Sequence, residues 1–171
     1  RRSVYNSMTS RLLVDKIEGK STSSNVIMPA GHVLQVVRAS RNATSHEAFS
    51  TTSFATSTLS LSLTPKASGN KVIVQCFIGM ANKGTDSSSQ TALYIDGSNV
   101  SSDDGSGYYY WAGYWDAANH NYHGGSGYYE YTTVDTNAHT FALYCKIDSG
   151  SNVFNLHSAA SHALICTEVQ V

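Results

Sequence analysis

Apolar and polar residues alternate along much of the chain, and this period of two residues is typical of β-strands. In KVIVQCFIGMA (71–81) the alternation places five side chains on one face, namely Val72, Val74, Cys76, Ile78 and Met80. HTFALYCKIDSGSN (139–152) shows the same pattern and ends in a turn signal; its one-sided residues are Phe141, Leu143, Cys145 and Ile147. Both segments are predicted to form strands with one buried face.

Shorter strand-like runs, separated by turn signals, fill much of the remaining chain. The predicted strands are GHVLQVV (31–37), SLSLTP (60–65), TALYIDGSN (91–99), VFNLHS (153–158) and HALICTEVQV (162–171). The turn signals are KASGN, NKGTDSSS, DGSN, DDGSG, HGGSG, DTNA and DSGSN. Many short strands at this spacing predict an all-β fold, either an antiparallel β-sandwich or a jelly roll. The best helical pattern, SRLLVDKIEGK (10–20), is short.

The first 29 residues differ from the rest because their apolar side chains are too few to form a core. Leu12, Val14, Ile17, Val26 and Met28 are among these thinly spread residues. We expect residues 1–29 to be an extended shaft or linker segment that packs on the main domain or twines with its own copies. Residues 30–171 are long enough for one β-sandwich domain with its own core. Because the chain begins with Arg1 and Arg2, we expect a fragment or a processed product.

The composition argues against several function classes. Charged residues make up 13% of the chain, and its net charge is −1, so nothing indicates binding to nucleic acid or to an anionic membrane. No signal peptide and no apolar run of membrane-spanning length appears. Cys76, Cys145 and Cys166 lie far apart in apolar runs without CxxC spacing. We therefore predict buried free thiols, which suit assembly in a reducing cytosol.

Aromatic side chains concentrate in one region, between residues 108 and 131. GYYYWAGYW (107–115) has six aromatic residues in nine positions, and four more tyrosines follow among glycine, serine and asparagine. Strand alternation would place the tryptophans against protein and leave Tyr108, Tyr110 and Tyr114 facing outward. Tyrosine offers a large rigid face and a hydroxyl, whereas serine, glycine and asparagine adapt to a ligand. The region therefore predicts a contact surface, for which sugars and protein receptors are both suitable ligands.

Several motifs resemble the C-terminal tip domain of bacteriophage tail fibres and related virion structural proteins. The motifs occur in this order: LLVDKI (12–17), NVIMPAGHVLQVV (25–37), FSTTSFATSTLSLSLTPKASGNKVIV (49–74), ALYIDGS (92–98), TVDTNAHTFALYCKI (133–147) and ICTEVQV (165–171), which contains Glu168. The chain departs from the pattern between residues 100 and 131. The resemblance implies a homotrimeric, mostly β domain that touches a host cell, and it does not imply an enzymatic reaction.

The predicted function is therefore host attachment by a virion adhesin, without enzymatic activity and without a cofactor. The expected partners are two further copies of the chain, an upstream fibre shaft or adaptor, and a cell-surface glycan or outer-membrane component. We expect assembly in the host cytoplasm and a final place in the virion. The predicted receptor-binding residues are Tyr108, Tyr110, Trp111, Tyr114, Asp116, His120, Tyr122, His123 and Tyr128.

Three alternatives remain open. The domain could be a purely structural or capping piece of a virion fibre, with its rings buried between copies. It could instead be a polysaccharide depolymerase with paired carboxylates, for which the candidates are Asp103, Asp104, Asp116 and Glu130. A secreted sandwich of the C1q or TNF type fits less well, because the thiols are free and no signal precedes them. His120 and His123 are weak candidates for a metal on a threefold axis.

Overall fold

The computed structural model describes residues 30–42, 45–83, 89–101, 121–147, 153–156 and 161–171, and of these it describes residues 80–83, 121–123 and 153–155 by their backbone alone. Residues 1–29 lie outside the described part of the chain, and so does the candidate helix at residues 10–20.

The described residues form ten strands and no helix. The strands are β1 (Val33–Arg41), β2 (Glu47–Phe49), β3 (Ala55–Leu63), β4 (Lys71–Lys83), β5 (Ser89–Ile95), β6 (Ser98–Asn99), β7 (Asn121–Thr132), β8 (His139–Ile147), β9 (Val153–Leu156) and β10 (His162–Val169). In sheet A the order is β1-β10-β4-β9-β2, with β7 paired to the other side of β4; sheet B has the order β3-β8-β5-β6. Every described pairing is antiparallel.

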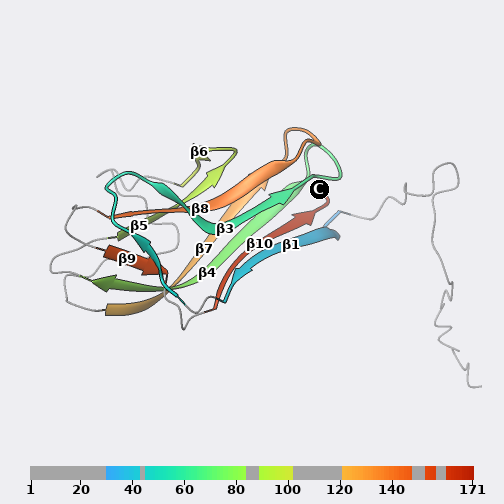
Figure 1. Ribbon diagram of the computed structural model, residues 1–171. Coiled ribbons are helices and arrows are strands. Elements are labelled where there is room, and N and C mark those ends of the chain that lie inside the picture. The colour runs from blue at the N-terminus through green and yellow to red at the C-terminus, as the bar shows by residue number, and fades with distance from the viewer. Residues whose placement is uncertain (1–29, 43–44, 84–88, 102–120, 148–152, 157–160) are drawn as a thin grey trace, which may run out of the picture.

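The two sheets lie face to face and share one hydrophobic core, a sandwich-like arrangement (Figure 1). The alternation predicted for residues 71–81 places Val72, Val74, Cys76 and Ile78 in this core. The alternation at residues 139–147 adds Phe141, Leu143, Cys145 and Ile147. Sheet B also contributes Leu59, Leu61 and Leu63 of β3, whose neighbours Ser60 and Ser62 are exposed. The prediction of an all-β antiparallel fold is confirmed.

The DGSN signal is confirmed as a tight hairpin between β5 and β6. Asp96 and Gly97 adopt φ angles of 51° and 79°, the left-handed region that asparagine, aspartate and glycine enter most readily. Consecutive residues of this kind match the twist of two antiparallel strands.

The HGGSG signal, in contrast, is wrong as a turn, because Gly124, Gly125 and Gly127 lie within β7. β7 pairs with β4 without interruption from Thr132 opposite Lys71 to Asn121 opposite Asn82. Glycine weakens a strand by its backbone entropy, but here continuous pairing along β4 outweighs that local preference.

The carboxylate of Glu168 lies in the interior, fully buried, where it joins three segments. Its Oε1 accepts hydrogen bonds from the Lys66 amide (2.8 Å) and from Asn70 Nδ2 (2.6 Å), and its Oε2 accepts one from Gln35 Nε2 (2.6 Å). A buried charge is stable only when donors of this kind replace water. Glu168 thus fastens β10 to β1 and to the connection between β3 and β4.

The three cysteines are free and buried, as predicted. Burial raises the pKa of Cys76 and of Cys166 to about 12, and it raises the pKa of Cys145 well above its ordinary value. All three thiols are therefore protonated at neutral pH and shielded from reagents.

We predict that Glu168→Ala lowers the free energy of unfolding by about 3 kcal/mol, since it leaves buried donors without an acceptor. Glu168→Gln should cost roughly half as much, because its amide oxygen can keep the two bonds made by Oε1. Urea denaturation measures both, with Thr167→Ala on the other face of the strand as the control. Equal stability of all four proteins would contradict the assignment.

A second prediction concerns the thiols. At pH 8 Ellman's reagent should react with none of the three cysteines in the folded protein, since a pKa of about 12 leaves almost no thiolate. In guanidinium chloride all three should react within minutes. Rapid labelling of any thiol under native conditions would show that its burial is incomplete.

Candidate functional site

Most of the predicted receptor-binding residues lie outside the described part of the chain. This holds for Tyr108, Tyr110, Trp111, Tyr114, Asp116 and His120. The backbones of Tyr122 and His123 lie in β7, opposite Ala81 and Met80 of β4, but their side chains are outside the description. Of the nine predicted residues, the structure therefore describes one side chain, that of Tyr128.

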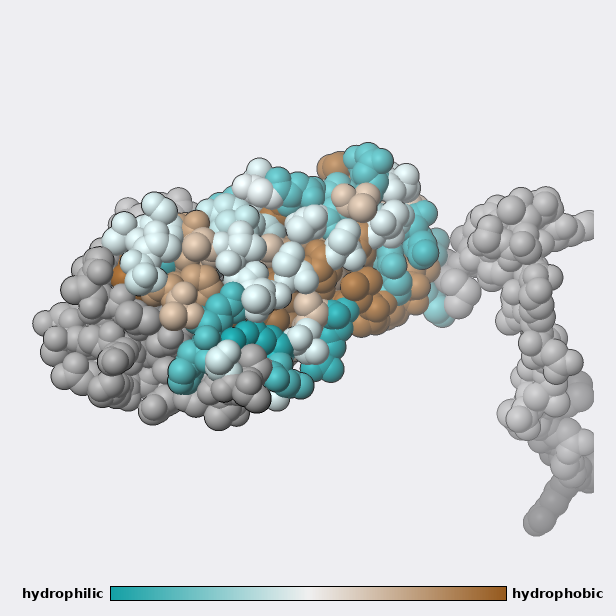
Figure 2. All heavy atoms as spheres, in the orientation of Figure 1, coloured by the Kyte–Doolittle hydropathy of each residue, from teal (hydrophilic) through white to brown (hydrophobic). Residues whose placement is uncertain are grey.

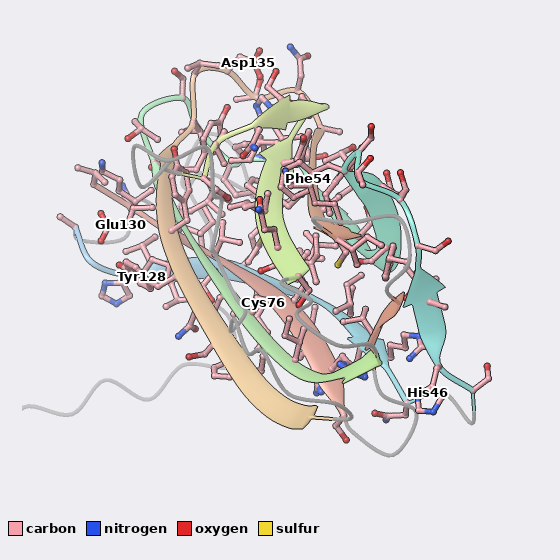
Figure 3. The ribbon with its side chains drawn as sticks, turned by 90° about the vertical axis from the view of Figure 1, so that its left-hand side faces the viewer. His46, Phe54, Cys76, Tyr128, Glu130 and Asp135 are labelled. Atoms are coloured by element: carbon pink, nitrogen blue, oxygen red, sulfur yellow. The ribbon has the colours of Figure 1, made fainter. Side chains whose placement is uncertain are left out.

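Tyr128 points out of sheet A, away from the core. Along β7 exposed and partly buried residues alternate, so that Tyr128 and Glu130 face outward while Tyr129 and Tyr131 pack on the core. Figure 3 shows Tyr128 and Glu130 on the side of β7 that faces away from Cys76. The Tyr128 side chain remains 57% exposed. Its hydroxyl donates a hydrogen bond to Glu130 Oε1, and this bond raises the pKa of Tyr128.

The outward residues of four neighbouring strands line up with Tyr128 and Glu130 in three rows across sheet A. We call these residues the outer patch. From β1 through β10 and β4 to β7, the rows are Val36, Thr167, Ile73 and Glu130; Arg38, Ile165, Gln75 and Tyr128; and Ser40, Ala163, Phe77 and Ser126. Within the patch Val36 is 59% exposed and Phe77 is 47% exposed.

A second group of rings lies on the outward side of sheet B. We call it the ring cluster: Phe54, Tyr94 and Tyr144, with Lys146. The rings of Tyr94 and Tyr144 stack at 3.8 Å between centroids, Phe54 meets Tyr94 edge to face at 5.9 Å, and Lys146 Nζ lies 4.9 Å from the centre of the Phe54 ring. All four side chains are half-buried. Stacked and edge-on rings of this kind form a rigid, amphipathic surface.

Sequence reasoning missed the ring cluster, although a signal was present. The triplet Ala-Leu-Tyr occurs at residues 92–94 and again at residues 142–144. In each triplet the leucine points into the core, so the tyrosine must point outward. What the sequence could not supply is the register, which pairs Tyr94 with Ala142 and Ala92 with Tyr144 and so brings the two rings together.

The cluster also lies next to the chain that leads into the aromatic-rich segment. Tyr94 of β5 is paired with Asn99 of β6. The chain leaves β6 at Asn99 and, after the aromatic-rich residues, joins β7 of the other sheet at Asn121.

A third group consists of His139 between two carboxylates, Asp96 of the β5–β6 hairpin and Asp135 of the β7–β8 connection. Its Nδ1 lies 2.6 Å from Asp96 Oδ2, and its Nε2 lies 3.2 Å from Asp135 Oδ1, although the angles at Nε2 are not those of a hydrogen bond. Asp96 also accepts a hydrogen bond from the Thr140 amide at 2.8 Å. These contacts hold Asp96 in its left-handed conformation and fasten the hairpin to β8.

The two carboxylates have lowered pKa values for different reasons. Partial burial alone would raise the pKa of Asp96, but the hydrogen bonds from His139 and the Thr140 amide outweigh it. The amide and side chain of Asn137 lower the pKa of Asp135. This group joins the β5–β6 hairpin to the start of β8 and to the β7–β8 connection, which is a structural role.

Neither the metal prediction nor the depolymerase prediction is tested by these groups. Within the described residues no set of three histidine, cysteine, aspartate or glutamate side chains is placed to hold a metal ion, but His120 and the His123 side chain lie outside that part. Of the depolymerase candidates, Asp103, Asp104 and Asp116 also lie outside the described residues. Glu130 accepts a hydrogen bond from the Tyr128 hydroxyl. The described part contains no apolar helix of the length needed to cross a bilayer.

Comparison of the chain with models of protein families and with curated proteins finds no match. The resemblance to tail-fibre tip domains therefore rests on the sequence motifs alone.

We predict that acid destabilises the protein partly through Asp96. A carboxylate whose pKa is lowered by folding stabilises the folded state above its unfolded pKa of about 3.9, and this contribution is lost as the pH falls through the folded value. The urea midpoint of the wild type should therefore fall between pH 5 and pH 3. Asp96→Asn keeps the left-handed turn and should show a shallower fall. The same pH dependence in both proteins would contradict this role.

Proposed function

We propose that the chain is an adhesin, the tip domain of a bacteriophage tail fibre or a related virion protein, which binds a receptor on the host cell surface. The receptor is a glycan or an outer-membrane component, and binding needs no catalytic step. Three copies associate, residues 1–29 lead from an upstream shaft or adaptor, and assembly takes place in the host cytoplasm.

The ring cluster is the observation that carries this proposal. Phe54, Tyr94 and Tyr144 are fixed by mutual stacking, so a ligand that contacts them costs little side-chain entropy. Rings accept the C–H faces of sugars, and neighbouring hydroxyl, amide and ammonium groups can bind their oxygens. The cluster adjoins Asn99, from which the chain enters the aromatic-rich segment. We propose that this segment, including Tyr108, Tyr110, Trp111 and Tyr114, completes the receptor surface.

Asp116, His120, Tyr122 and His123 belong to the same proposed surface as polar partners for the ligand. Tyr128 is assigned differently. It points outward from sheet A, whereas Tyr94 and Tyr144 point outward from sheet B, so one small ligand cannot contact both. We propose that Tyr128 serves association between copies.

The order of the strands supports a jelly-roll interpretation of the fold. The chain passes from β3 in sheet B to β4 in sheet A and back to β5, and from β6 it passes to β7, β8 and β9 with a change of sheet at every step. Greek-key connections of this kind build jelly rolls. Such domains present their loops and outer faces as binding surfaces on a rigid framework.

Trimerisation would give the adhesin its strength. Three weak sites that engage one cell surface together can raise avidity by about 10²- to 10⁴-fold without any new contact. The structural alternative, a capping domain of a fibre, is favoured by the exposed apolar side chains of the outer patch. The two functions are compatible only if the ring cluster stays accessible after assembly.

The test is binding to intact bacterial cells and to an array of bacterial surface glycans. Tyr144→Ala, Tyr110→Ala and Trp111→Ala are each expected to weaken binding about 5- to 150-fold, because each removes an aromatic contact worth about 1–3 kcal/mol. Ser62→Ala, on the same side of sheet B, is the matched control and should bind like the wild type. All variants are first checked for an unchanged melting temperature.

Two outcomes would overturn the proposal. Undiminished binding by all three folded ring variants would remove the site. Release of reducing ends from host polysaccharide, abolished by Glu130→Gln or Asp116→Asn, would replace adhesion by the depolymerase alternative.

A further inference from the structure

The outer faces of the two sheets differ sharply in chemistry. On sheet B the outward residues of β3 and the start of β8 are hydroxyl side chains, namely Thr56, Thr58, Ser60, Ser62 and Thr140. Figure 2 shows pale and teal residues over β3 and β8, and brown hydrophobic residues at the end of the molecule where β1 and β10 lie. On sheet A the outer patch exposes Val36, Phe77 and Tyr128, which are half of the six exposed large hydrophobic side chains in the described chain.

We infer that the outer patch is the surface through which copies of this chain associate, with the β1 edge of each copy against the β7 edge of the next. The inference rests on the proposed homotrimer and names its interface. Three observations support a second copy of the chain as the occupant, rather than a different partner: the position of the charges, the net charge and the size of the face.

The charges of the patch sit at opposite edges. Arg38 lies on β1, and within the described residues its side chain makes no hydrogen bond or ion pair. Glu130 lies on β7, with one carboxylate oxygen bonded to Tyr128. Because β10 and β4 lie between β1 and β7, the two edge strands are about 14 Å apart. Arg38 and Glu130 therefore cannot pair within one copy.

A ring of copies related by rotation about an axis parallel to the strands brings the β1 edge of one copy beside the β7 edge of the next. Arg38 belongs to the same row as Tyr128, and Glu130 is one row away, about 7 Å along the strand. The long arginine side chain covers that distance and would meet both the tyrosine ring and the carboxylate of the neighbouring copy. Since the two edges differ, the contact is head-to-tail, and a closed assembly of such contacts is a ring.

The centre of the patch suits burial between copies. Ile73 and Ile165 lie between the charged edges and are only partly buried in one copy. Four strands of about nine residues cover a face of roughly 600 Å². A trimer that turns three such faces toward its axis covers about 1,800 Å² in all, or about 600 Å² for each pair of copies. A net charge of −1 leaves little repulsion between copies.

Charge reversal tests the pairing of edges. Sedimentation velocity of the full chain should show a trimer for the wild type. Arg38→Glu and Glu130→Arg should each raise the midpoint concentration of the monomer–trimer equilibrium at least tenfold. Each substitution places two like charges next to each other across the interface. The double variant Arg38→Glu/Glu130→Arg restores opposite charges and should recover the trimer. Phe77→Glu should give a monomer, and Ser60→Glu on sheet B is the matched control.

Cysteine cross-linking gives an independent readout. In Arg38→Cys/Tyr128→Cys the two cysteines belong to the same row, but about 14 Å separates them within one copy. They are too far apart to join there, since disulfides need Cα atoms within about 7 Å. The three native thiols are buried and do not compete. Mild oxidation should therefore produce covalent trimers on a non-reducing gel, whereas the Arg38→Cys/Ser60→Cys variant should not.

The outcomes separate this inference from the proposed function. A monomeric wild type overturns the inference. A trimer also overturns it if the trimer persists in Phe77→Glu and in both charge reversals and the cysteine pair forms no covalent link. A dimer that the same substitutions dissociate supports the interface and overturns the threefold arrangement. Loss of receptor binding in Tyr144→Ala with an intact trimer concerns the ring cluster alone.

Discussion

The pairing of β4 on both of its sides is the constraint on which the rest of the molecule depends. β10 on one side and β7 on the other are held in register over most of their length. Because side chains alternate between the faces of a sheet, this one register decides two surfaces at once. It sends Val72, Val74 and Cys76 into the core, and it aligns the rows of the outer patch on the opposite face. A slip of one residue would exchange the two.

Strand alternation was the strongest guide from the sequence, and it succeeded where one face of a strand meets the core. Residues 71–81 and 139–147 follow it closely, because burial selects apolar side chains at every second position. The turn signal failed at Gly124, Gly125 and Gly127, whose local preference for a turn gave way to long-range pairing with β4. The two neighbours in the ring cluster, Tyr94 and Tyr144, could not be matched from the sequence, since their contact depends on the register between β5 and β8.

The buried polar residues illustrate the same limit. Glu168 stands out in the final strand as a lone carboxylate, but its donors come from Gln35, Lys66 and Asn70, which are distant along the chain. His139 likewise finds Asp96 only because the hairpin folds over the start of β8. Both groups join segments that are distant in the sequence, so local sequence patterns cannot predict their contacts. Both also stabilise connections between strands. The framework between the two outer faces is thereby fixed at its loops as well as in its core.

The buried thiols determine how the protein responds to oxidising surroundings. Cys76, Cys145 and Cys166 are inaccessible and protonated, so a change from reducing to oxidising surroundings leaves the covalent structure as it was. The fold does not depend on a disulfide. No enzyme is therefore needed to form one, and no reductant can weaken the fold by breaking one. Its durability in air or in an extracellular fluid is therefore a matter of packing and hydrogen bonding, and not of redox state.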